Sequence, residues 1–317
     1  MWSAVKILLV GKKQKYNAEF FYERAFRQLG HDVNLVDSYS DVRHPFFSRY
    51  LHTRTSVFDF TLGGYWINIH LPKIVESYDP DAVIIFKGEF VSAHTVEKIS
   101  HNHSTYLLYP DTFKFKPLLR RFISSYRKIF TSANNKEFYY RLGARNVITV
   151  PWAFDPDFHR PLDIDRRYDV SFIGTAYPER RRIIRNLHAV EVFGDFWYGF
   201  GRHSHPPVFG EEFVKTINQS KINLNLQAKV SVLADSPTMR TFEVAGCGGF
   251  QISDYMPSLK RYFPSIVSFR DSRELKELIR YYLDSYDEAK EVAIKTMETC
   301  RSNYKYTDAA RKILNSM

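Results

Sequence analysis

Short apolar runs alternate with amphipathic segments along most of this 317-residue chain. Apolar runs without polar interruptions are typical of parallel strands that are buried on both faces. Strands that alternate with helices predict a parallel sheet with right-handed crossovers. In the first half, we expect a helix at 18–29 and strands at 5–10, 33–36, 81–86, 105–109, 128–131 and 147–150.

The alternation stops at residues 151–168, where three prolines stand among charged residues, and it then begins again. We therefore predict an interdomain linker at this position, followed by a second sheet. The second half has expected strands at 169–173, 190–193, 222–226, 250–252 and 267–269, and helices at 275–283, 288–300 and 309–314. Both halves thus predict an α/β fold with a parallel sheet in each of two domains.

Composition narrows the class of partner and the compartment. The formal net charge is +10, which favours acidic partners: phosphates, an anionic membrane face or nucleic acid. The two cysteines, Cys247 and Cys300, are too few for a disulfide framework, and the chain opens directly into a predicted strand. We expect a cytoplasmic protein, with peripheral contact at the inner face of the membrane as a further expectation.

Two parallel-sheet domains are shared by dehydrogenases, glycosyltransferases and periplasmic binding proteins. The segment after the first strand, residues 11–15, lacks the three-glycine dinucleotide fingerprint, which disfavours a dehydrogenase. The expected absence of a secretory signal disfavours a periplasmic binding protein.

The most informative segment is 240–254, which reads RTFEVAGCGGFQISD. It predicts a short helix with Glu243, a glycine turn that contains Gly248 and Gly249, and a buried strand. Glycines let a ligand approach the backbone, and a carboxylate suits the hydroxyl groups of a ribose. Asp235 lies eight residues before Glu243, so the two carboxylates are expected to face one crevice. The alternative is a turn whose glycines serve packing only, and the motif taken alone favours that alternative.

A set of segments in the second half resembles the spore-maturation-protein-like glycosyltransferases, which have the GT-B fold. The segments are YDVSFIG at 168–174, YPER at 177–180, SKINLN at 220–225, RTFE at 240–243 with the glycines that follow, and RYYL at 280–283. Weaker similarities in the first half lie at 29–33, 86–89, 109–111, 142–144 and 150–153. The resemblance covers most of the chain.

The resemblance implies two Rossmann-like domains that face a central cleft. It gives an acceptor-side domain at 1–155, a donor-binding domain at 156–300, and a C-terminal helix at 301–317 that packs back on the first domain. It also implies a nucleoside-diphosphate sugar as co-substrate, no cofactor and no dedicated metal. This chain departs from the related retaining enzymes in having Asp235 where they usually have glutamate, which bears on sugar contacts. It also has Tyr306-Thr-Asp308 before Arg311 where the family often has a His-Thr-Tyr element.

Glycosyl transfer needs a bound nucleotide, a neutralised diphosphate and an activated acceptor hydroxyl. Glu243 is the candidate for the ribose hydroxyls. Arg240 precedes it by about one helical turn, so both side chains are expected to face one crevice, and a guanidinium there suits a diphosphate. Arg180, after the Gly174 loop, is the second diphosphate candidate, and the N-terminus of the helix after Gly174 adds backbone donors.

The remaining candidates are less strongly indicated by the sequence. Asn225 points to the same strand face as Asn223, either toward the donor or as a structural amide. Asp111 and Glu89 follow predicted strands and are candidates for the acceptor base, with helix capping as the alternative role. His101 with His103 and His203 with His205 lack a third ligand at a recognisable spacing, so no metal site is predicted.

Three hypotheses follow. The first is a metal-independent glycosyltransferase that acts on a hydroxyl of a glycan or glycoconjugate. The second is a phage-type DNA-modifying transferase that acts on hydroxylated bases, and only the basic charge favours it. The third is a non-catalytic nucleotide- or sugar-binding protein.

Overall fold

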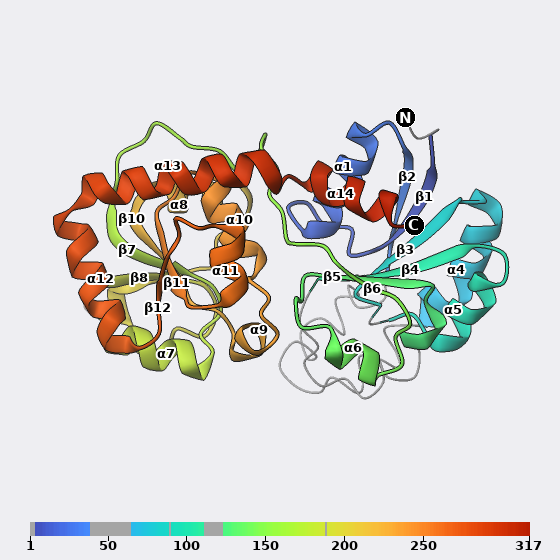
Figure 1. Ribbon diagram of the computed structural model, residues 1–317, viewed down its shortest axis with the longest axis horizontal. Coiled ribbons are helices and arrows are strands. Elements are labelled where there is room, and N and C mark those ends of the chain that lie inside the picture. Colours follow the sequence, from blue (N-terminus) through green and yellow to red (C-terminus); the bar gives the residue numbers. More distant parts are fainter. Residues whose placement is uncertain (1–3, 39–64, 89, 111–122, 188) are drawn as a thin grey trace. The chain divides into compact units, whose positions relative to one another are not determined.

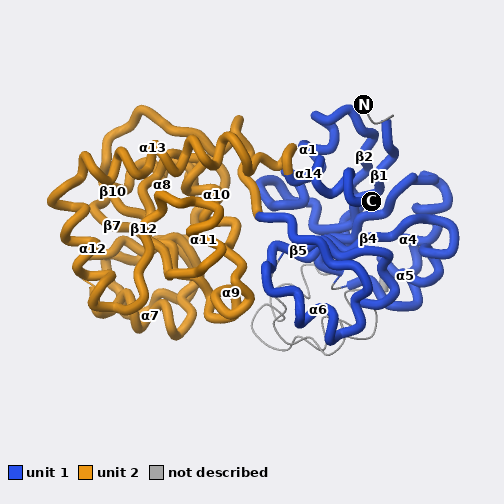
Figure 2. Tube along the Cα trace, in the orientation of Figure 1, with its two compact units in different colours: residues 1–151, 309–317 blue, residues 152–308 orange. Residues whose placement is uncertain are grey.

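The structure is a computed structural model, and it describes residues 4–38, 65–88, 90–110, 123–187 and 189–317. The chain divides into two compact units (Figure 2). Unit 1 contains residues 1–151 and 309–317, and unit 2 contains residues 152–308. Each unit is built around one parallel sheet of six strands with helices packed against it (Figure 1). The α/β fold class predicted from the alternating pattern is therefore confirmed.

Unit 1 has the strand order β2-β1-β3-β4-β5-β6, and every neighbouring pair is parallel. The strands are β1 (Lys6–Gly11), β2 (Asp32–Asp37), β3 (Ala82–Phe86), β4 (Ser104–Tyr109), β5 (Lys128–Thr131) and β6 (Val147–Thr149). The described helices are α1 (Ala18–Gln28), α4 (Tyr65–Tyr78), α5 (Ala93–Ser100), the 3-10 helix η3 (Ile123–Ser125), α6 (Glu137–Arg141) and most of α14 (Tyr306–Asn315). The central strands β1 and β3 are buried on both faces, as their uninterrupted apolar sequences predict.

The C-terminal segment is part of unit 1. Ala310 and Ile313 of α14 are fully buried. The Lys128 ammonium at the start of β5 donates to the carbonyl of Ser316 and, at 3.3 Å, to that of Met317. The end of the chain is thereby fixed beside β5, and the apolar side of the last helix is buried.

Unit 2 has the strand order β12-β11-β10-β7-β8-β9, again with parallel neighbours. The strands are β7 (Tyr168–Ile173), β8 (Val190–Phe193), β9 (Ser204–His205), β10 (Ser220–Asn225), β11 (Gln251–Asp254) and β12 (Val267–Phe269). The helices are α7 (Pro178–Arg185), the 3-10 helix η4 (Gly201–His203), α8 (Gly210–Asn218), α9 (Lys229–Leu233), α10 (Met239–Gly246), α11 (Pro257–Tyr262), α12 (Ser272–Asp284) and α13 (Tyr286–Asn303). In the described part of the chain, no helix is long and apolar enough to cross a membrane.

The segment predicted as a linker, 151–168, is irregular but packs tightly within unit 2. Phe154 is fully buried and forms a parallel bridge with Lys305. A Cβ atom at Gly246 would lie 2.3 Å from the Phe154 ring, so α10 packs directly against this segment. His159 is also buried. The segment therefore supplies side chains to the interior of unit 2, which its prolines and charges did not indicate.

Candidate functional site

The strand order places a topological switch point between β7 and β10. The chain proceeds from β7 through β8 to β9 on one side, and β10, β11 and β12 follow on the other. In open parallel sheets, ligands bind outside the carboxyl ends of the strands at such a point, because the connections leave in opposite directions. The candidate site of unit 2 is therefore the region where β7, β10 and β11 end.

Arg180 of α7 spans this switch point. Its Nε atom donates to the carbonyl of Leu226 after β10 at 3.0 Å, and its Nη1 atom donates to the carbonyl of Thr175 after β7 at 3.2 Å. Burial lowers the pKa of Arg180, and the nearby positive charge of Arg240 acts in the same direction. The two predicted arginines are thus close enough to repel each other.

Arg240 lies in the first turn of α10. Its guanidinium lies over the ring of Phe213 from α8, with Cζ 4.2 Å from the ring centroid. Burial lowers its pKa, and the nearby Glu243 carboxylate partly restores it, with Nε and Oε2 3.9 Å apart. The Nη1 atom is buried and has no hydrogen-bond partner among the described residues. A buried guanidinium nitrogen without a partner is costly unless a ligand completes it, and an oxyanion is the natural complement.

Glu243 is buried on α10 beside His159, whose Nε2 atom lies 3.5 Å from Glu243 Oε1. The backbone N–H of Asp155 donates to His159 Nδ1 at 3.1 Å, so Nδ1 is an acceptor and the ring proton is on Nε2, toward Glu243. Burial opposes ionisation of Glu243, but the hydrogen bond from His159 and the charge of Arg240 hold its pKa below the ordinary value. A carboxylate is therefore maintained inside the unit.

Asn225, at the end of β10, belongs to a buried network of amides and hydroxyls. Its Nδ2 atom donates to Thr241 Oγ1 at 2.8 Å and to Gln251 Oε1 at 3.0 Å, and its Oδ1 atom accepts from Gln227 Nε2 at 3.1 Å. These hydrogen bonds give Asn225 a structural role, which was one of the two roles that the sequence allowed. The network fixes the end of β10 relative to α10 and β11.

Gly174, directly after β7, has φ +155°, and its carbonyl accepts from the Trp197 ring N–H at 2.8 Å. A Cβ atom at the neighbouring Gly194 would lie 2.3 Å from the Gly174 carbonyl oxygen. Two strand ends therefore pass each other so closely at this point that a side chain at Gly194 would clash. The sequence indicated Gly174 and missed Gly194.

The glycine turn was predicted to let a ligand approach the backbone, but its glycines are needed for internal packing. Gly248 and Gly249 lie at the C-terminal end of α10 and lead into the amino end of β11, away from the carboxyl ends where Arg180 lies. A Cβ atom at Gly248 would meet Met297 Sδ at 3.1 Å, and one at Gly249 would meet Ile217 Cγ2 at 2.8 Å. The close approach that these glycines allow is made by the protein's own side chains. The packing alternative accounts for the turn, and neither glycine forms part of the switch-point site.

The Asp235 carboxylate has partners in α11. Its Oδ1 atom accepts from the backbone N–H of Ser258 at 2.8 Å, in the first turn of α11, and its Oδ2 atom lies 3.7 Å from Arg261 Nη2. Asp235 therefore caps α11. These partners of Asp235 thus differ from those of Glu243, which are His159 and Arg240.

The candidate base residues Glu89 and Asp111 lie outside the described residues. Sequence reasoning missed Asp254, at the end of β11, whose Oδ2 atom accepts from the backbone N–H of Gln227 at 2.6 Å. Burial raises the pKa of Asp254 to about 6, against the opposing charge of Arg180. The rule that selected Glu89 and Asp111, a carboxylate directly after an apolar strand, would also have found Asp254. No local pattern indicated His159 or Phe213.

The histidine pair at 203 and 205 has a partner that its spacing did not reveal. His203 Nδ1 lies 2.7 Å from Glu191 Oε1, and His205 Nε2 lies 2.6 Å from Glu191 Oε2. Burial opposes ionisation of Glu191, but the two histidines hold its pKa below the ordinary value. Glu191 of β8 is thus connected to His203 of η4 and to His205 of the edge strand β9, and the three side chains are explained as structural contacts.

Comparisons with known proteins show what this chain is similar to. Residues 166–315, which contain nearly all of unit 2, match a family described as glycosyl transferase-like. Over 269 residues the chain is 24% identical to spore protein CgeB of Bacillus subtilis, covering 74% of this chain and 79% of that protein.

Solved structures show the same architecture. Sucrose-phosphate synthase from Thermosynechococcus elongatus superposes with a TM-score of 0.71 at 9% identity, covering 98% of this chain and 97% of that one. Anabaena HepE in complex with UDP superposes with a TM-score of 0.62 at 9% identity, covering 98% and 99%. These likenesses show the two-unit GT-B fold. With the family match of residues 166–315 and the similarity to CgeB, they support one conclusion: the chain has the GT-B fold and is similar to the CgeB-like glycosyltransferases.

Proposed function

We propose that this enzyme transfers a sugar from a nucleoside-diphosphate sugar to a hydroxyl group of a glycan or glycoconjugate. The observation that carries the proposal is the pair of arginines at the switch point of unit 2. Arg180 donates to neutral carbonyls, and Nη1 of Arg240 has no partner among the described residues. A diphosphate would complement both guanidinium groups. The HepE structures with UDP and with UDP-glucose support this class of donor.

In the proposed reaction, the bond between the anomeric carbon and the diphosphate oxygen breaks, and the acceptor oxygen forms the new bond. Negative charge develops on the departing diphosphate, where Arg180 and Arg240 would stabilise it. Two guanidinium groups supply the positive charge that a divalent cation would otherwise provide, so we propose that transfer needs no metal. The acceptor hydroxyl loses its proton to a base, for which Glu89 and Asp111 remain the candidates.

Glu243 would accept hydrogen bonds from the ribose hydroxyl groups. An ionised carboxylate can only accept, which suits two neighbouring hydroxyl donors. Its lowered pKa keeps it ionised at neutral pH in spite of its burial. The Glu243→Ala variant distinguishes an enzyme from a binder: transfer of labelled sugar should be lost while the variant still unfolds cooperatively, at a lower temperature because Arg240 and His159 lose a buried partner. A protein without transfer activity toward any glycan acceptor would contradict the proposal.

The donor assignment is tested by calorimetry with a nucleoside and its diphosphate. Arg240→Ala and Arg180→Ala should weaken binding of the nucleoside diphosphate far more than binding of the nucleoside, because an arginine at this place contacts phosphate and not the base. Arg182→Ala is the matched control, since Arg182 is exposed on the same helix as Arg180. Equal losses for both ligands would reject the assignment. Unchanged activity in EDTA supports the metal-independent reaction.

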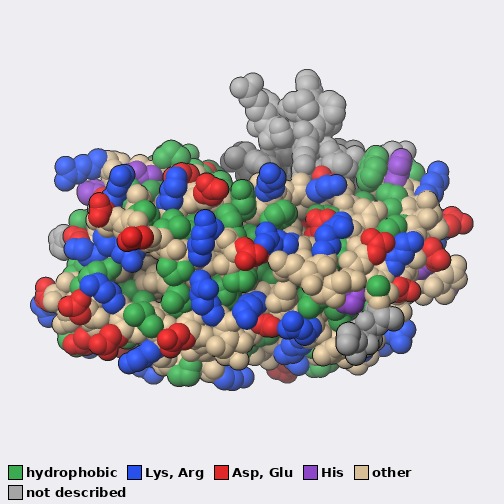
Figure 3. Space-filling model, turned by 90° about the horizontal axis from the view of Figure 1, so that it is seen from above, with side chains coloured by type: hydrophobic (Ala, Val, Ile, Leu, Met, Phe, Trp, Pro, Cys, Tyr) green, Lys and Arg blue, Asp and Glu red, His purple; other side chains and the backbone are tan. Residues whose placement is uncertain are grey.

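The net basic charge is the only feature that favours a DNA acceptor. On the face shown in Figure 3, basic and acidic side chains are interspersed over the described residues. A nucleic-acid site would instead give duplex binding that falls steeply with salt concentration. Salt-dependent binding together with transfer to hydroxylated DNA would favour the phage-type activity over the glycan acceptor. Peripheral contact with an anionic membrane is likewise a proposal, to be tested by sedimentation with anionic and neutral vesicles.

A further inference from the structure

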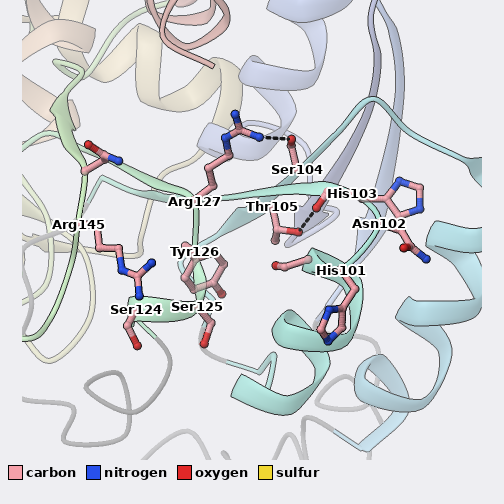
Figure 4. Close-up of a pocket in the computed structure, with 12 residues that line it drawn as sticks. His101, Asn102, His103, Ser104, Thr105, Ser124, Ser125, Tyr126, Arg127 and Arg145 are labelled. Carbon is pink, nitrogen blue, oxygen red and sulfur yellow. Dashed lines mark hydrogen bonds between the residues drawn. The ribbon is translucent and has the colours of Figure 1, made fainter.

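Unit 1 has a polar cavity of about 580 Å³ at the amino ends of β4, β5 and β6. It is lined by the turn after α5, by η3, and by the residues that lead into these three strands (Figure 4). Serine, threonine, asparagine, histidine and arginine form the lining together with Tyr126, and no aspartate or glutamate is among the lining residues. Such a composition favours a ligand that carries both hydroxyl groups and negative charge.

Two arginines give the cavity its charge. Arg127, before β5, donates from Nη1 to the hydroxyl of Ser104 at 3.1 Å, as Figure 4 shows. Arg145, before β6, has no hydrogen bond or ion pair with any described residue, and its side chain lies near Ser124 of η3 in Figure 4. The partner of Arg127 is neutral, so neither positive charge is compensated by a carboxylate in the described part of the chain. Guanidinium groups in this state are suited to phosphate oxygens.

The neighbouring polar groups add hydrogen-bonding capacity without adding negative charge. Asn102 and Asn146 each offer amide donors and an acceptor, and Ser124 is an exposed hydroxyl. The nearby Glu97 does not neutralise the arginines, because its Oε1 atom accepts from Ser125 Oγ at 3.2 Å and it has no ion pair with either of them among the described residues. Amides and hydroxyls of this kind are ordinary partners of sugar hydroxyl groups.

The cavity is distinct from the switch point of its own sheet. A ligand at the switch point would contact the carboxyl ends of β1 and β3, whereas this cavity lies at the amino ends of other strands. Tyr126 is buried, so the rings that the lining presents are the imidazoles of His101 and His103. The polar and cationic lining favours a carbohydrate anion over a nucleotide.

We propose that this cavity binds the phosphomonoester group of a phosphorylated sugar, with Arg127 and Arg145 on the phosphate and the asparagine and serine side chains on the sugar hydroxyls. The test is isothermal titration of the full-length protein with glucose 6-phosphate, glucose and inorganic phosphate. Glucose 6-phosphate should bind more tightly than the other two probes. Arg127→Gln with Arg145→Gln should weaken its binding at least about tenfold, because charge-assisted hydrogen bonds are lost.

Two controls locate the effect. Arg141→Gln removes an exposed arginine of the same unit that is paired with Glu137, and it should leave the affinity unchanged. Arg240→Ala should also leave it unchanged, because Arg240 belongs to the proposed donor site in unit 2. An unchanged unfolding temperature shows that the double variant is folded. If the double variant is not folded, the single variants Arg127→Gln and Arg145→Gln are measured in its place. Absence of binding at millimolar concentration, equal binding by wild type and double variant, or a loss in Arg240→Ala equal to that of the double variant would overturn the proposal. Equal affinity for inorganic phosphate would overturn the assignment to a sugar.

Discussion

In unit 1 the switch point lies between β1 and β3, and in unit 2 it lies between β7 and β10. At the switch point of unit 1, a side chain of the protein lies at the end of β1. Glu19 of α1 is buried there and accepts a hydrogen bond from the backbone N–H of Lys12 at 3.3 Å. A Cβ atom at Gly11 would lie 2.7 Å from Glu19 Cγ. The switch point of unit 2 carries Arg180 and Arg240, one of which keeps a buried nitrogen unpaired among the described residues.

The pKa values of the two buried glutamates are shifted in opposite directions. Burial raises the pKa of Glu19, and the backbone hydrogen bonds and lysine charges around it offset only part of that effect. Glu243 is also buried, but His159 and Arg240 hold its pKa below the ordinary value. One strand topology therefore supports a buried glutamate with a raised pKa in unit 1 and a buried glutamate with a lowered pKa, beside His159 and Arg240, in unit 2. The fold offers a place for a ligand, and the side chains decide whether it becomes a site.

The largest effect is expected from Arg240→Ala. If the arginines of unit 2 stabilise the departing diphosphate, this change should lower kcat/KM by about 10²–10³-fold, as loss of one preorganised donor does. The steady-state rate of sugar transfer measures it, with Arg182→Ala as the control on the neighbouring surface. A transfer rate of Arg240→Ala within about twofold of wild type would be as small as the ordinary effect of a surface substitution. Such a rate would show that the unit 2 switch point is no more functional than that of unit 1.

His159→Phe should have the next largest effect, a loss of about tenfold in affinity for the nucleoside diphosphate. Phenylalanine keeps the packing against Phe213 but cannot donate to Glu243, so the pKa of Glu243 should rise. Because a depressed carboxylate pKa contributes affinity that disappears as the pH falls through it, the variant should lose binding at a higher pH than wild type does.

His159→Gln provides the rescue, since its amide can still donate to Glu243. Binding measured across the acidic range separates the two variants. If both variants lose affinity equally and with the same pH profile, then His159 has only a packing role.

Glu19→Gln tests the other side of the comparison. The pKa of Glu19 is raised in the folded protein above its ordinary value of 4.5, so its ionisation destabilises the fold as the pH rises through the folded pKa. The neutral variant should therefore be relatively more stable at about pH 8 than at about pH 4, by about 1.4 kcal/mol for each pH unit that separates the folded pKa from the unfolded pKa. Urea unfolding measures the difference, and Glu23→Gln on the same helix is the control. A large loss of transfer activity in Glu19→Gln would show that unit 1 holds a reacting carboxylate at its switch point.

The smallest effect is expected from Gly248→Ala. The φ of +69° and the contact with Met297 should lower the free energy of unfolding by about 1 kcal/mol. Nucleotide affinity should stay unchanged, because this glycine lies at the amino end of β11. Gly30→Ala, with φ +87° and open space around it, isolates the cost of the backbone conformation. If Gly248→Ala binds nucleotide more weakly but is as stable as wild type, then the glycine turn is part of the donor site.

The sequence by itself determined both parallel sheets, because an uninterrupted apolar run such as Ile7 to Val10 can be satisfied only by burial on both faces. It also determined that Arg240 and Glu243 are neighbours, because residues one helical turn apart share a face. Local spacing carries this information without reference to the rest of the chain.

Only the tertiary structure decided which distant groups these residues meet. His159 reaches Glu243 from a segment that reads as a linker, Asp235 turns toward α11, and Gly248 packs against Met297 of α13. Each of these contacts joins elements far apart in the sequence, so no local period records it. Burial then sets the charge state: two glutamates of the same chemistry have pKa values shifted in opposite directions because one has a histidine and an arginine beside it.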